Sequence, residues 1–572
     1  MKFPKITRFL PDWKSAALAV LSAILLILAF PDFEFSFLAW FALIPLLWAV
    51  EREKESLIKS FAVGWVFGTV FFFGTCWWLT FAPITYAAFP PILAYSLFFC
   101  VALVAGLFPA IFAIIVSVFL RRFTSYGIFA APFIWIFAEF LRYWLTGNNW
   151  NAIGYSQAFG GLGLQYASLG GIYLSGFLVV LPSVVITFLF INYYRFLSDS
   201  RTAPSFLIVL YSLFGFAFFL NKSARAAAKE AVKEIDARGG ANDKERLLIV
   251  GLFLGVLSIP GFIAGFLLDQ TRHQPNEDLQ AKVVAIQPNV PMAGLTFEKW
   301  KSLRHKHVEL AEFALSQLPT GDRRPTTVIF PESPMNFAYE EDKEFQRFVH
   351  AFAAKHDVNV LFNSAEPDAA NNKYFNSAVL VGPRGSELAQ YDKIYLVPFG
   401  ESVPAPLQSI VPAFVGSFSF GSEYDLVPLG DAKAGIMICF ESHFGQLSRE
   451  YVRNGADVLI EMTNDGYLGP TPVLRQHLAN AVFRAVETNR PVLRVTNVGI
   501  TAYINERGQV IDPAASYTED TRIWTVSKSD GGQTFYVRYG DWFAWVCSIV
   551  TIGLLIFGIA TGRRSSPMET NL

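Results

Sequence analysis

Apolar residues dominate eight long stretches of the chain, and most are long enough to be membrane helices. A helix needs about 20 apolar residues to cross the hydrocarbon of a bilayer. The stretches run over residues 16–30, 35–50, 60–81, 91–120, 128–145, 169–193, 247–268 and 542–561. The first follows basic residues but ends in Phe30-Pro31-Asp32, which is not a small-residue cleavage site. We therefore expect a retained span there and about eight transmembrane helices in all.

Charge in the connecting segments predicts the orientation of these helices. The connections 52–59, 121–122 and 195–201 carry Lys or Arg, whereas the connections 82–90 and 146–168 carry neither. Basic loops stay in the cytoplasm, so the basic connections and the N-terminus are predicted to be cytoplasmic. Seven crossings then precede Asp269, which places the next domain outside the cytoplasmic membrane.

One further apolar stretch, 205–220, is predicted not to cross the membrane. Both of its flanks are basic, and most of the basic residues in the two flanks lie in the following segment 221–246. A full crossing would place that charge outside, so we expect a helix that dips into or lies along the cytoplasmic interface. The segment 221–246 is then a cytoplasmic insertion.

From about residue 280 to 526 the pattern changes to short β-branched strands separated by amphipathic helices. The clearest strands are 282–286, 326–330, 358–362, 378–381, 434–439, 458–463 and 491–505, and the clearest helices are 345–356 and 474–488. This pattern is typical of an α/β domain, and about 250 residues suffice for its own core. We expect a helical membrane domain over 1–270, a catalytic domain over 271–535, and a last span with a short tail over 536–572.

Composition supports this division and excludes several classes of protein. The chain is 53% hydrophobic and 16% aromatic, which is too apolar for an ordinary soluble protein. A net charge of -1 gives no indication of nucleic-acid binding. The four cysteines form no disulfide framework, and the seven histidines form no HExxH pair. We therefore expect no metal and no cofactor.

Candidate chemistry lies at three strand ends of the α/β domain. Glu332 follows one apolar run, Lys393 is embedded among aromatic and aliphatic residues, and Cys439 ends another apolar run. Cys439 is also the only cysteine outside the long apolar stretches. Each has an ordinary explanation when taken alone: a solvated carboxylate, a snorkelling lysine and an inert buried thiol. Together they supply a base, a cation and a nucleophile.

The sequence motifs around these residues resemble motifs of the nitrilase superfamily. The motifs in this chain are Pro331-Glu332-Ser333, the run Asp392–Glu401 (DKIYLVPFGE), Cys439–Ser442 (CFES) and Asn464–Gly469 (NDGYLG). The resemblance implies an α-β-β-α sandwich and a Glu-Lys-Cys triad. The whole chain, with its spans, is similar to the apolipoprotein N-acyltransferase family, including residues 139–142 and 154–157.

That second resemblance implies an acyl transfer in the bacterial inner membrane, with the catalytic domain on the periplasmic face. An acyl chain of a phospholipid would pass through a Cys439 thioester to the α-amine of a diacylglyceryl-cysteine on an apolipoprotein. Glu332 would be the base, and Lys393 with the backbone N–H of Phe440 would bind the oxyanion. Phe440 stands where the family often carries tyrosine. A monomer is expected.

Two more carboxylates match acidic positions of the family. Glu401 and Glu441 are predicted to orient Lys393 and the attacking amine, and the alternative for Glu441 is that it merely holds the loops. His443 could suggest a Cys-His hydrolase, but it follows Cys439 by only four residues, and we expect a surface residue.

Six further residues are candidates for substrate contact, namely Trp300, Glu139, Arg142, Phe414, Phe418 and Tyr467. Glu139 and Arg142 lie three apart near the end of a span, so either they pair with each other or they contact a lipid headgroup. The loop 414–420 either covers acyl chains or packs as an ordinary loop.

Two rival functions remain open from the sequence. A membrane-tethered amidase or nitrilase would pass the same thioester to water, but it would not need a large membrane half. A transporter or scaffold with an inactive domain would not need Glu332, Lys393 and Cys439 together.

Overall fold

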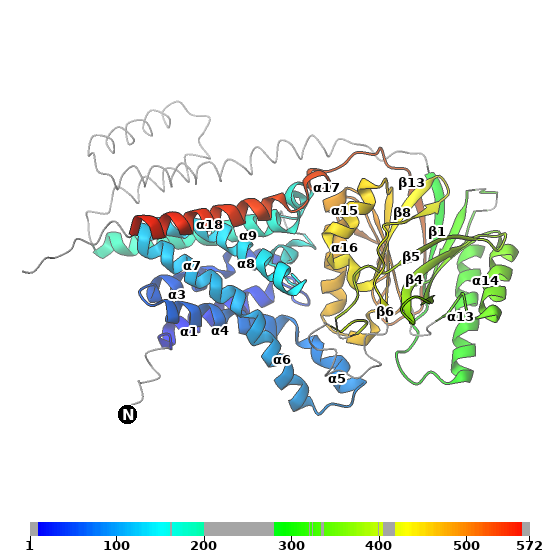
Figure 1. The fold of residues 1–572 in the computed structure, drawn as a ribbon, viewed down its shortest axis with the longest axis horizontal. Coiled ribbons are helices and arrows are strands. Elements are labelled where there is room, and N and C mark those ends of the chain that lie inside the picture. Colours follow the sequence, from blue (N-terminus) through cyan, green and yellow to red (C-terminus); the bar gives the residue numbers. More distant parts are fainter. Residues whose placement is uncertain are drawn as a thin grey trace, which may run out of the picture.

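The structure, a computed structural model, describes residues 10–160, 163–198, 279–319, 321–322, 324–332, 337–398, 400–403 and 418–562. Figure 1 shows a helical half beside an α/β half. The predicted stretches 205–220 and 247–268, the insertion 221–246 and residue Phe414 lie outside the described residues.

The helical half is a bundle of long apolar helices, joined by the C-terminal helix α18 (Figure 1). Its helices are α1 (Trp13–Leu28), α2 (Ala39–Ala42), α3 (Ile44–Glu53), α4 (Leu57–Thr75), α5 (Phe81–Thr85), α6 (Pro91–Ala105), α7 (Leu107–Phe123), α8 (Ala131–Thr146), α9 (Ala167–Ser198) and α18 (Trp542–Gly562). The predicted stretch 35–50 is divided between α2 and α3, with Pro45 in the first turn of α3. A proline is tolerated in a first turn, where its missing N–H has no partner to lose.

Close packing of α4 on α7 depends on small residues. A Cβ atom added at Gly64 would lie 2.4 Å from the Pro109 carbonyl oxygen, and one at Gly68 would lie 2.8 Å from the Gly106 Cα. Helices in membranes associate where small side chains let their backbones approach, because lipid supplies no hydrophobic drive. These two glycines therefore fix the contact between α4 and α7.

The length and apolar composition of its helices make the helical half typical of a membrane protein. In the described part of the chain, three helical segments are long and apolar enough to cross a membrane: Leu57–Thr75, Pro91–Thr146 and Leu164–Asn192. Trp13–Leu28 and Trp542–Gly558 are shorter apolar helices. The count of about eight transmembrane helices stays a prediction.

The α/β half contains two facing sheets. One has the order β13-β1-β2-β3-β4-β5, with β6 paired to β4, and the other has the order β12-β11-β10-β9-β8-β7. Their strands are β1 (Leu279–Gln287), β2 (Thr326–Ile329), β3 (Asn359–Asp368), β4 (Lys373–Val381), β5 (Glu387–Asp392), β6 (Phe418–Ser419), β7 (Leu426–Leu429), β8 (Ala432–Ile438), β9 (Val458–Thr463), β10 (Val492–Thr496), β11 (Ala502–Ile504), β12 (Val510–Ile511) and β13 (Asp520–Ser527).

Helices cover the outer face of each sheet and complete the four layers (Figure 1). The helices α13 (Phe297–Ser316) and α14 (Lys343–His356) lie on the first sheet, away from the helical half. The helices α15 (Gly445–Arg453) and α16 (Val473–Thr488) lie on the second sheet, and the short α17 (Phe535–Tyr539) leads into α18. The predicted α-β-β-α sandwich is confirmed.

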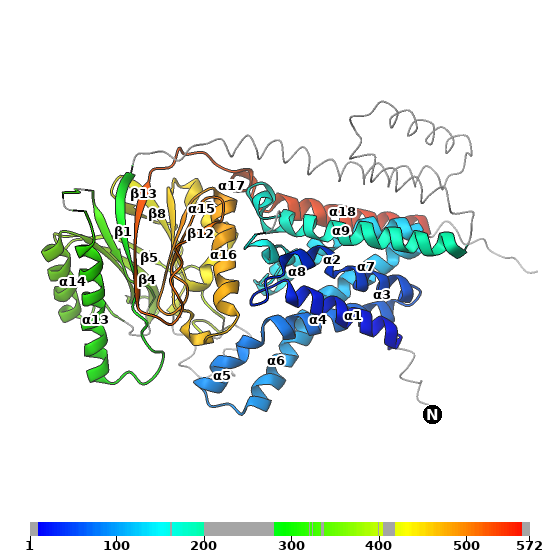
Figure 2. The ribbon, with the colours of Figure 1, turned by 180° about the vertical axis from the view of Figure 1, so that it is seen from behind.

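Helix α16 lies between the second sheet and the helical half in both views (Figures 1 and 2). Its Gln476 accepts hydrogen bonds at Oε1 from the indole N–H groups of Trp78 and Trp150, each at 3.0 Å, and from Asn151 at 3.3 Å. The Gln476 amide group donates to the carbonyl oxygens of Thr75 at 3.0 Å and Pro31 at 3.3 Å. One buried side chain therefore joins several segments of the helical half to the α/β half.

An ion pair made by the preceding residue of α16 strengthens this junction. The Arg475 guanidinium binds both carboxylate oxygens of Glu34, at 2.7 and 2.9 Å. It also lies 3.8 Å from the centre of the Phe159 ring. Bidentate geometry and stacking make such a pair more specific than a single surface contact.

Candidate active site

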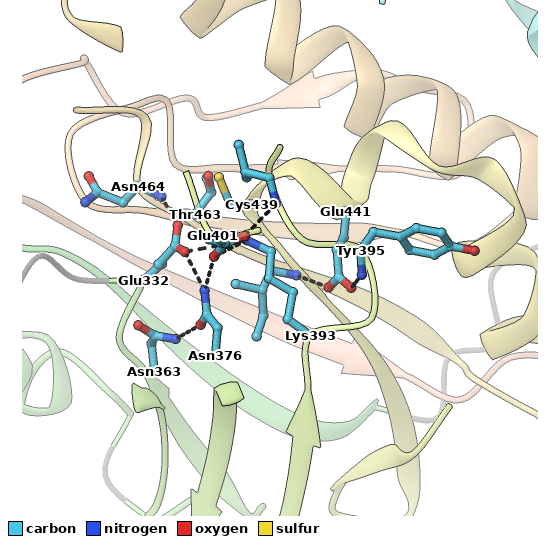
Figure 3. A network of polar contacts seen from close by, with 12 residues as sticks. Glu332, Asn363, Asn376, Lys393, Tyr395, Glu401, Cys439, Glu441, Thr463 and Asn464 are labelled. Atoms are coloured by element: carbon cyan, nitrogen blue, oxygen red, sulfur yellow. Dashed lines mark hydrogen bonds and ion pairs between the residues drawn. The ribbon is translucent and has the colours of Figure 1, made fainter. Parts of the chain in front are cut away.

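Three strand ends bring the predicted trio together (Figure 3). Glu332 follows β2, Lys393 directly follows β5, and Cys439 directly follows β8. The first two come from one sheet and Cys439 comes from the other, so the trio lies between the two sheets. The Lys393 Nζ is 3.9 Å from the Glu332 carboxylate, and the Cys439 thiol is near enough to that carboxylate for the Glu332 charge to act on it.

Cys439 occupies an unusual backbone conformation. It begins the 3-10 turn Cys439–His443 with a φ of 54°, in the left-handed region that costs strain for a residue with a Cβ. This conformation ends the strand abruptly and presents the thiol at its tip. Burial raises the pKa of the thiol well above its ordinary value, and the Glu332 charge adds to this. The thiol is therefore neutral at rest and needs a base.

Glu332 is placed to be that base. The Asn376 amide group donates to its Oε1 at 3.1 Å, and the Asn464 backbone N–H donates to its Oε2 at 3.1 Å. Burial raises the pKa of Glu332 above its usual range, and the nearby Glu401 raises it further, while Lys393 opposes both. A raised pKa brings the carboxylate closer to the thiol whose proton it must take.

Lys393 carries a fixed positive charge at the centre of the site. It is fully buried, and its Nζ lies 2.8 Å from both carboxylate oxygens of Glu401. Burial alone would lower the pKa of Lys393, but Glu401 and Glu332 outweigh it and raise that pKa. Burial would in turn raise the pKa of Glu401, yet Lys393 holds it below its ordinary value. The lysine stays protonated, which its predicted role as an oxyanion donor requires.

Asn376 is a site residue that the sequence reasoning missed. Its amide group donates to Glu332 and also to Glu401 Oε1, at 2.6 Å, and its own Oδ1 accepts from Asn363 at 2.7 Å. It thus bridges two carboxylates that would otherwise repel each other. The available signal was a polar residue inside the apolar strand 373–381, but its partners depend on tertiary pairing.

Glu441 is held away from solvent by four donors. Its Oε1 accepts from the Tyr391 hydroxyl at 2.8 Å and from the N–H groups of Ile394 and Tyr395 at 2.7 and 3.0 Å. Its Oε2 accepts from the Ile438 N–H at 2.8 Å. These contacts tie the strand before Cys439 to the segment after Lys393, and they favour the loop-holding alternative.

An aromatic wall flanks the nucleophile on the side of the helical half. The Phe440 ring lies 6.4 Å from Trp150 and 5.5 Å from His443, nearly parallel to both, and 5.2 Å from Phe444. Trp150 belongs to the segment between α8 and α9, so the two halves meet beside Cys439.

The expectation that His443 is a surface residue is wrong. It is 2% exposed, its ring stacks 5.3 Å from Trp150, and its Nε2 accepts the Asn149 backbone N–H at 3.2 Å. Burial is the main reason that its pKa lies well below the ordinary value, and the Arg484 charge adds to it. The burial of His443 could not be predicted from the sequence, because the residues that cover it, Asn149 and Trp150, come from the helical half.

The remaining predicted residues lie at varying places in the fold. Tyr467 is 51% exposed, and its ring lies 6.4 Å from Tyr86 of the helical half. Trp300 lies on α13, with its ring 6.0 Å from Phe337 and 5.3 Å from the Arg304 guanidinium. Phe418 begins β6, paired in parallel with β4. All three residues stay candidates for substrate contact.

Glu139 and Arg142 have partners of their own inside the helical half. Glu139 Oε1 accepts from the Trp135 indole N–H at 2.9 Å and from the Ile153 N–H at 2.8 Å. Arg142 donates to the Trp150 carbonyl at 3.0 Å and lies 4.9 Å from the Phe72 ring centre. Both side chains line a cavity together with phenylalanines of α4 and α7. Arg142 therefore supports the segment that carries Trp150.

The trio and its carboxylates supply the groups that the predicted acyl transfer requires. Within the ranges that the structure describes, no cluster of three or more His, Cys, Asp or Glu side chains is arranged to hold a metal ion. A buried thiol, a carboxylate base and a buried ammonium are what a thioester mechanism requires.

The two-sheet fold is that of the carbon-nitrogen hydrolase class, and residues 308–536 match the carbon-nitrogen hydrolase family. Residues 22–185 match the apolipoprotein N-acyltransferase N-terminal domain. The chain is 31% identical over 559 residues to an apolipoprotein N-acyltransferase of Geobacter metallireducens, covering 96% of this chain and 95% of the relative. The chain belongs to the apolipoprotein N-acyltransferase family.

A second relative agrees with this assignment. The chain is 27% identical over 569 residues to an apolipoprotein N-acyltransferase of Thermotoga maritima, covering 98% of this chain and 96% of the relative. Among solved structures, a carbon-nitrogen hydrolase from Helicobacter pylori is similar to 45% of this chain and 91% of its own, with 19% identity and a TM-score of 0.34.

Proposed function

We propose that this enzyme moves an acyl chain from a phospholipid, through a Cys439 thioester, to the α-amine of the N-terminal diacylglyceryl-cysteine of an apolipoprotein. The observation that carries this proposal is the position of the nucleophile. Cys439 lies between a Glu-Lys pair of the α/β half and the Trp150 segment of the helical half. A lipid that enters from the helical half therefore arrives beside the thiol.

The first half reaction uses the trio. Glu332 takes the proton of the Cys439 thiol as Sγ attacks the ester carbonyl of the phospholipid. The charge that develops on the carbonyl oxygen is stabilised by the Lys393 ammonium and the Phe440 N–H. The intermediate then breaks its C–O bond, and Glu332 returns the proton to the departing lysophospholipid oxygen, leaving an acyl-thioester.

The second half reaction reverses these roles. The amine of the lipidated cysteine attacks the thioester carbonyl, and Glu332 accepts the proton that the amine loses. The C–S bond breaks, and the Cys439 sulfur recovers its proton from Glu332. Glu401 and Asn376 keep Lys393 and Glu332 in register through both steps. In the resting site, Glu441 acts on the loops and not on the amine.

Substrate contacts extend this proposal beyond the trio. Tyr467 and Phe440 are assigned to the walls around the thiol, and Phe414, Phe418 and Trp300 to covering segments. Glu139 and Arg142 act by supporting Trp150.

The same proposal includes the organisation of the chain in the membrane. It has domain boundaries at 270 and 535, multi-pass insertion in the inner membrane, a periplasmic catalytic domain and a monomeric state. A reporter fused at Gly240 should then give a cytoplasmic signal, and an external signal would contradict this topology.

A thioester trap tests the function. The protein is incubated with phospholipid labelled in its acyl chain and run on a non-reducing gel. We expect a hydroxylamine-sensitive adduct in the wild type and none in Cys439→Ala. A diacylglyceryl peptide with a free amine should discharge the adduct onto the peptide, and the same peptide with an acetylated amine is the matched control.

Two results would overturn the proposal. Discharge by water at the same rate without the peptide would make the enzyme a membrane-tethered amidase or nitrilase. No adduct with any phospholipid would favour a protein that does not catalyse acyl transfer.

A further inference from the structure

A buried ionic cluster lies directly behind the Cys439 turn. It contains Glu461 of β9, Asp465 just after β9, His477 of α16 and Arg494 of β10, which are 0%, 3%, 4% and 0% exposed. Arg494 pairs with both carboxylates, and its Nη2 lies 2.8 Å from Asp465 Oδ2. His477 also contacts both, with Nδ1 2.7 Å from Asp465 Oδ1 and Nε2 3.1 Å from Glu461 Oε1.

The partners of His477 require a charged ring. Its Nε2 lies 3.0 Å from the backbone carbonyl oxygen of Cys439. Both ring nitrogens therefore face acceptor oxygens, Nδ1 that of Asp465 and Nε2 those of Cys439 and Glu461. A neutral imidazole has a single N–H and would set a lone pair against one of these oxygens. The charged ring also balances two buried carboxylates against two cations. Burial lowers the pKa of His477, but Asp465 and Glu461 outweigh it and raise the pKa to about 9.

The carbonyl that His477 contacts belongs to a critical peptide. The peptide between Cys439 and Phe440 is planar and trans, so its C=O and N–H point in opposite directions. A donor that fixes the carbonyl of Cys439 therefore also fixes the direction of the Phe440 N–H. A cation on the carbonyl polarises the peptide and makes that N–H a stronger donor.

Helix α16 places a second cation on the same turn. The Arg484 guanidinium donates to the carbonyl oxygens of Ser442 at 3.2 Å and His443 at 3.0 Å. His477 and Arg484 lie seven residues apart on one helix, which corresponds to two turns and one face. The turn is thus held at its first and last carbonyls from one element, while its left-handed first residue stores strain.

The geometry points to His477 as a positioning residue whose charged ring holds the Cys439 carbonyl and so aims the Phe440 N–H at the oxyanion of the acyl intermediate. His477 does not touch the reacting atoms. The inference rests on the proposed function in taking Cys439 as the residue that is acylated and the Phe440 N–H as an oxyanion donor.

Two reactions of the same thiol test this role. Burst release of p-nitrophenol from p-nitrophenyl butyrate measures acylation of Cys439, which passes through an oxyanion. Alkylation of Cys439 by iodoacetamide forms no oxyanion. Both are measured in the full-length protein in detergent, with Cys439→Ala as the blank and His305→Gln, at an exposed histidine of α13, as the matched control.

We expect His477→Gln to slow acylation on the order of 10-fold to 100-fold, less than or comparable to the loss of one oxyanion donor, with alkylation within about 3-fold of the wild type. Asp465→Asn combined with His477→Gln keeps the buried charge balanced, so this variant guards against a folding defect. It should show the same split between the two reactions.

Other outcomes overturn the inference. If acylation is unchanged in both variants, or if acylation and alkylation fall together, His477 does not act on the oxyanion. A wild type that reacts with the aryl ester but not with phospholipid would contradict the proposed function and leave this test of His477 intact. A wild type that is not acylated at Cys439 by either ester would contradict both.

Discussion

At the scale of the residue, the site is a set of charges whose positions are fixed by burial. Lys393 has no exposed surface, and its ammonium group lies near two carboxylates, those of Glu332 and Glu401, to which different roles are assigned. Glu401 binds the ammonium closely, at 2.8 Å, whereas Glu332 stays 3.9 Å away, and its charge also acts on the Cys439 thiol. This asymmetry leaves Glu332 free to exchange a proton.

Glu332→Gln should abolish formation of the Cys439 adduct while the protein stays folded. Glutamine is nearly isosteric, but it cannot accept the thiol proton. We expect acylation to fall at least about 100-fold, by the usual size of general-base catalysis. Burst kinetics measure the rate and thermal unfolding in detergent checks the fold. An adduct formed at the wild-type rate would remove Glu332 from the base role.

The rate of adduct formation should rise with pH. Glu332 must be ionised to act as a base, and its pKa lies above the ordinary glutamate value, so the rising limb should lie above pH 4.5. Lys393 stays charged across this range because its pKa is raised. The limb reports Glu332 together with the neighbouring groups whose charges act on it, Lys393 and Glu401. A pH profile of the p-nitrophenol burst measures it, and a profile that falls with pH would contradict the assignment.

At the scale of the element, strand ends were the most predictable feature. The strand 458–463 is found as predicted, and Glu332 and Cys439 follow β2 and β8, which were also predicted, whereas β5, which precedes Lys393, was not among the predicted strands. A strand end is visible in sequence because an apolar run stops at a polar residue. The predicted strand 491–505 is instead two antiparallel strands, β10 and β11, because residues 497–501 turn between them.

Features that depend on pairing between distant segments were not predictable. Strand β13 was missed because most of its side chains are partly exposed and charged residues interrupt it. Asn376 reaches the site only because β4 pairs with β3 and β5. The burial of His443 depends on Trp150 from the other half. None of these relations leaves a local pattern in the sequence.

Gly435→Ala should destabilise β8, the strand that carries Cys439. An added Cβ would lie 2.4 to 2.7 Å from ring and Cβ atoms of Tyr451, which is itself fully buried. Overpacking of this kind costs about 1–3 kcal/mol. Thermal unfolding measures the loss, and Gly553→Ala is the control, since a methyl there meets no atom within 4 Å. Equal stability of both variants would show that β8 tolerates the added methyl.

At the scale of the whole molecule, the two halves act as one unit. Gln476 alone makes five hydrogen bonds to segments of the helical half, and Arg475 adds an ion pair with Glu34. The adjacent residue, His477, contacts the backbone carbonyl oxygen of Cys439. The packing of the membrane helices therefore reaches the catalytic turn through two consecutive residues of one helix.

Gln476→Ala should weaken the junction and slow adduct formation together. Each buried partner left without a hydrogen bond costs about 1–3 kcal/mol, and the variant leaves several such groups. We expect a lower unfolding temperature and easier proteolysis between the halves. Gln317→Ala, at an exposed glutamine, is the matched control. An unchanged unfolding temperature would mean that the junction does not depend on this side chain.

Helix α16 also limits how this protein could be re-engineered. Every side chain of Val473–Thr488 except Arg475 is buried, with a sheet on one side and membrane helices on the other. Separating the catalytic domain would transfer an entire helical face from protein to water, including tryptophan partners and buried charges. A water-soluble version would therefore require a redesigned outer face on this one helix before any change at the thiol.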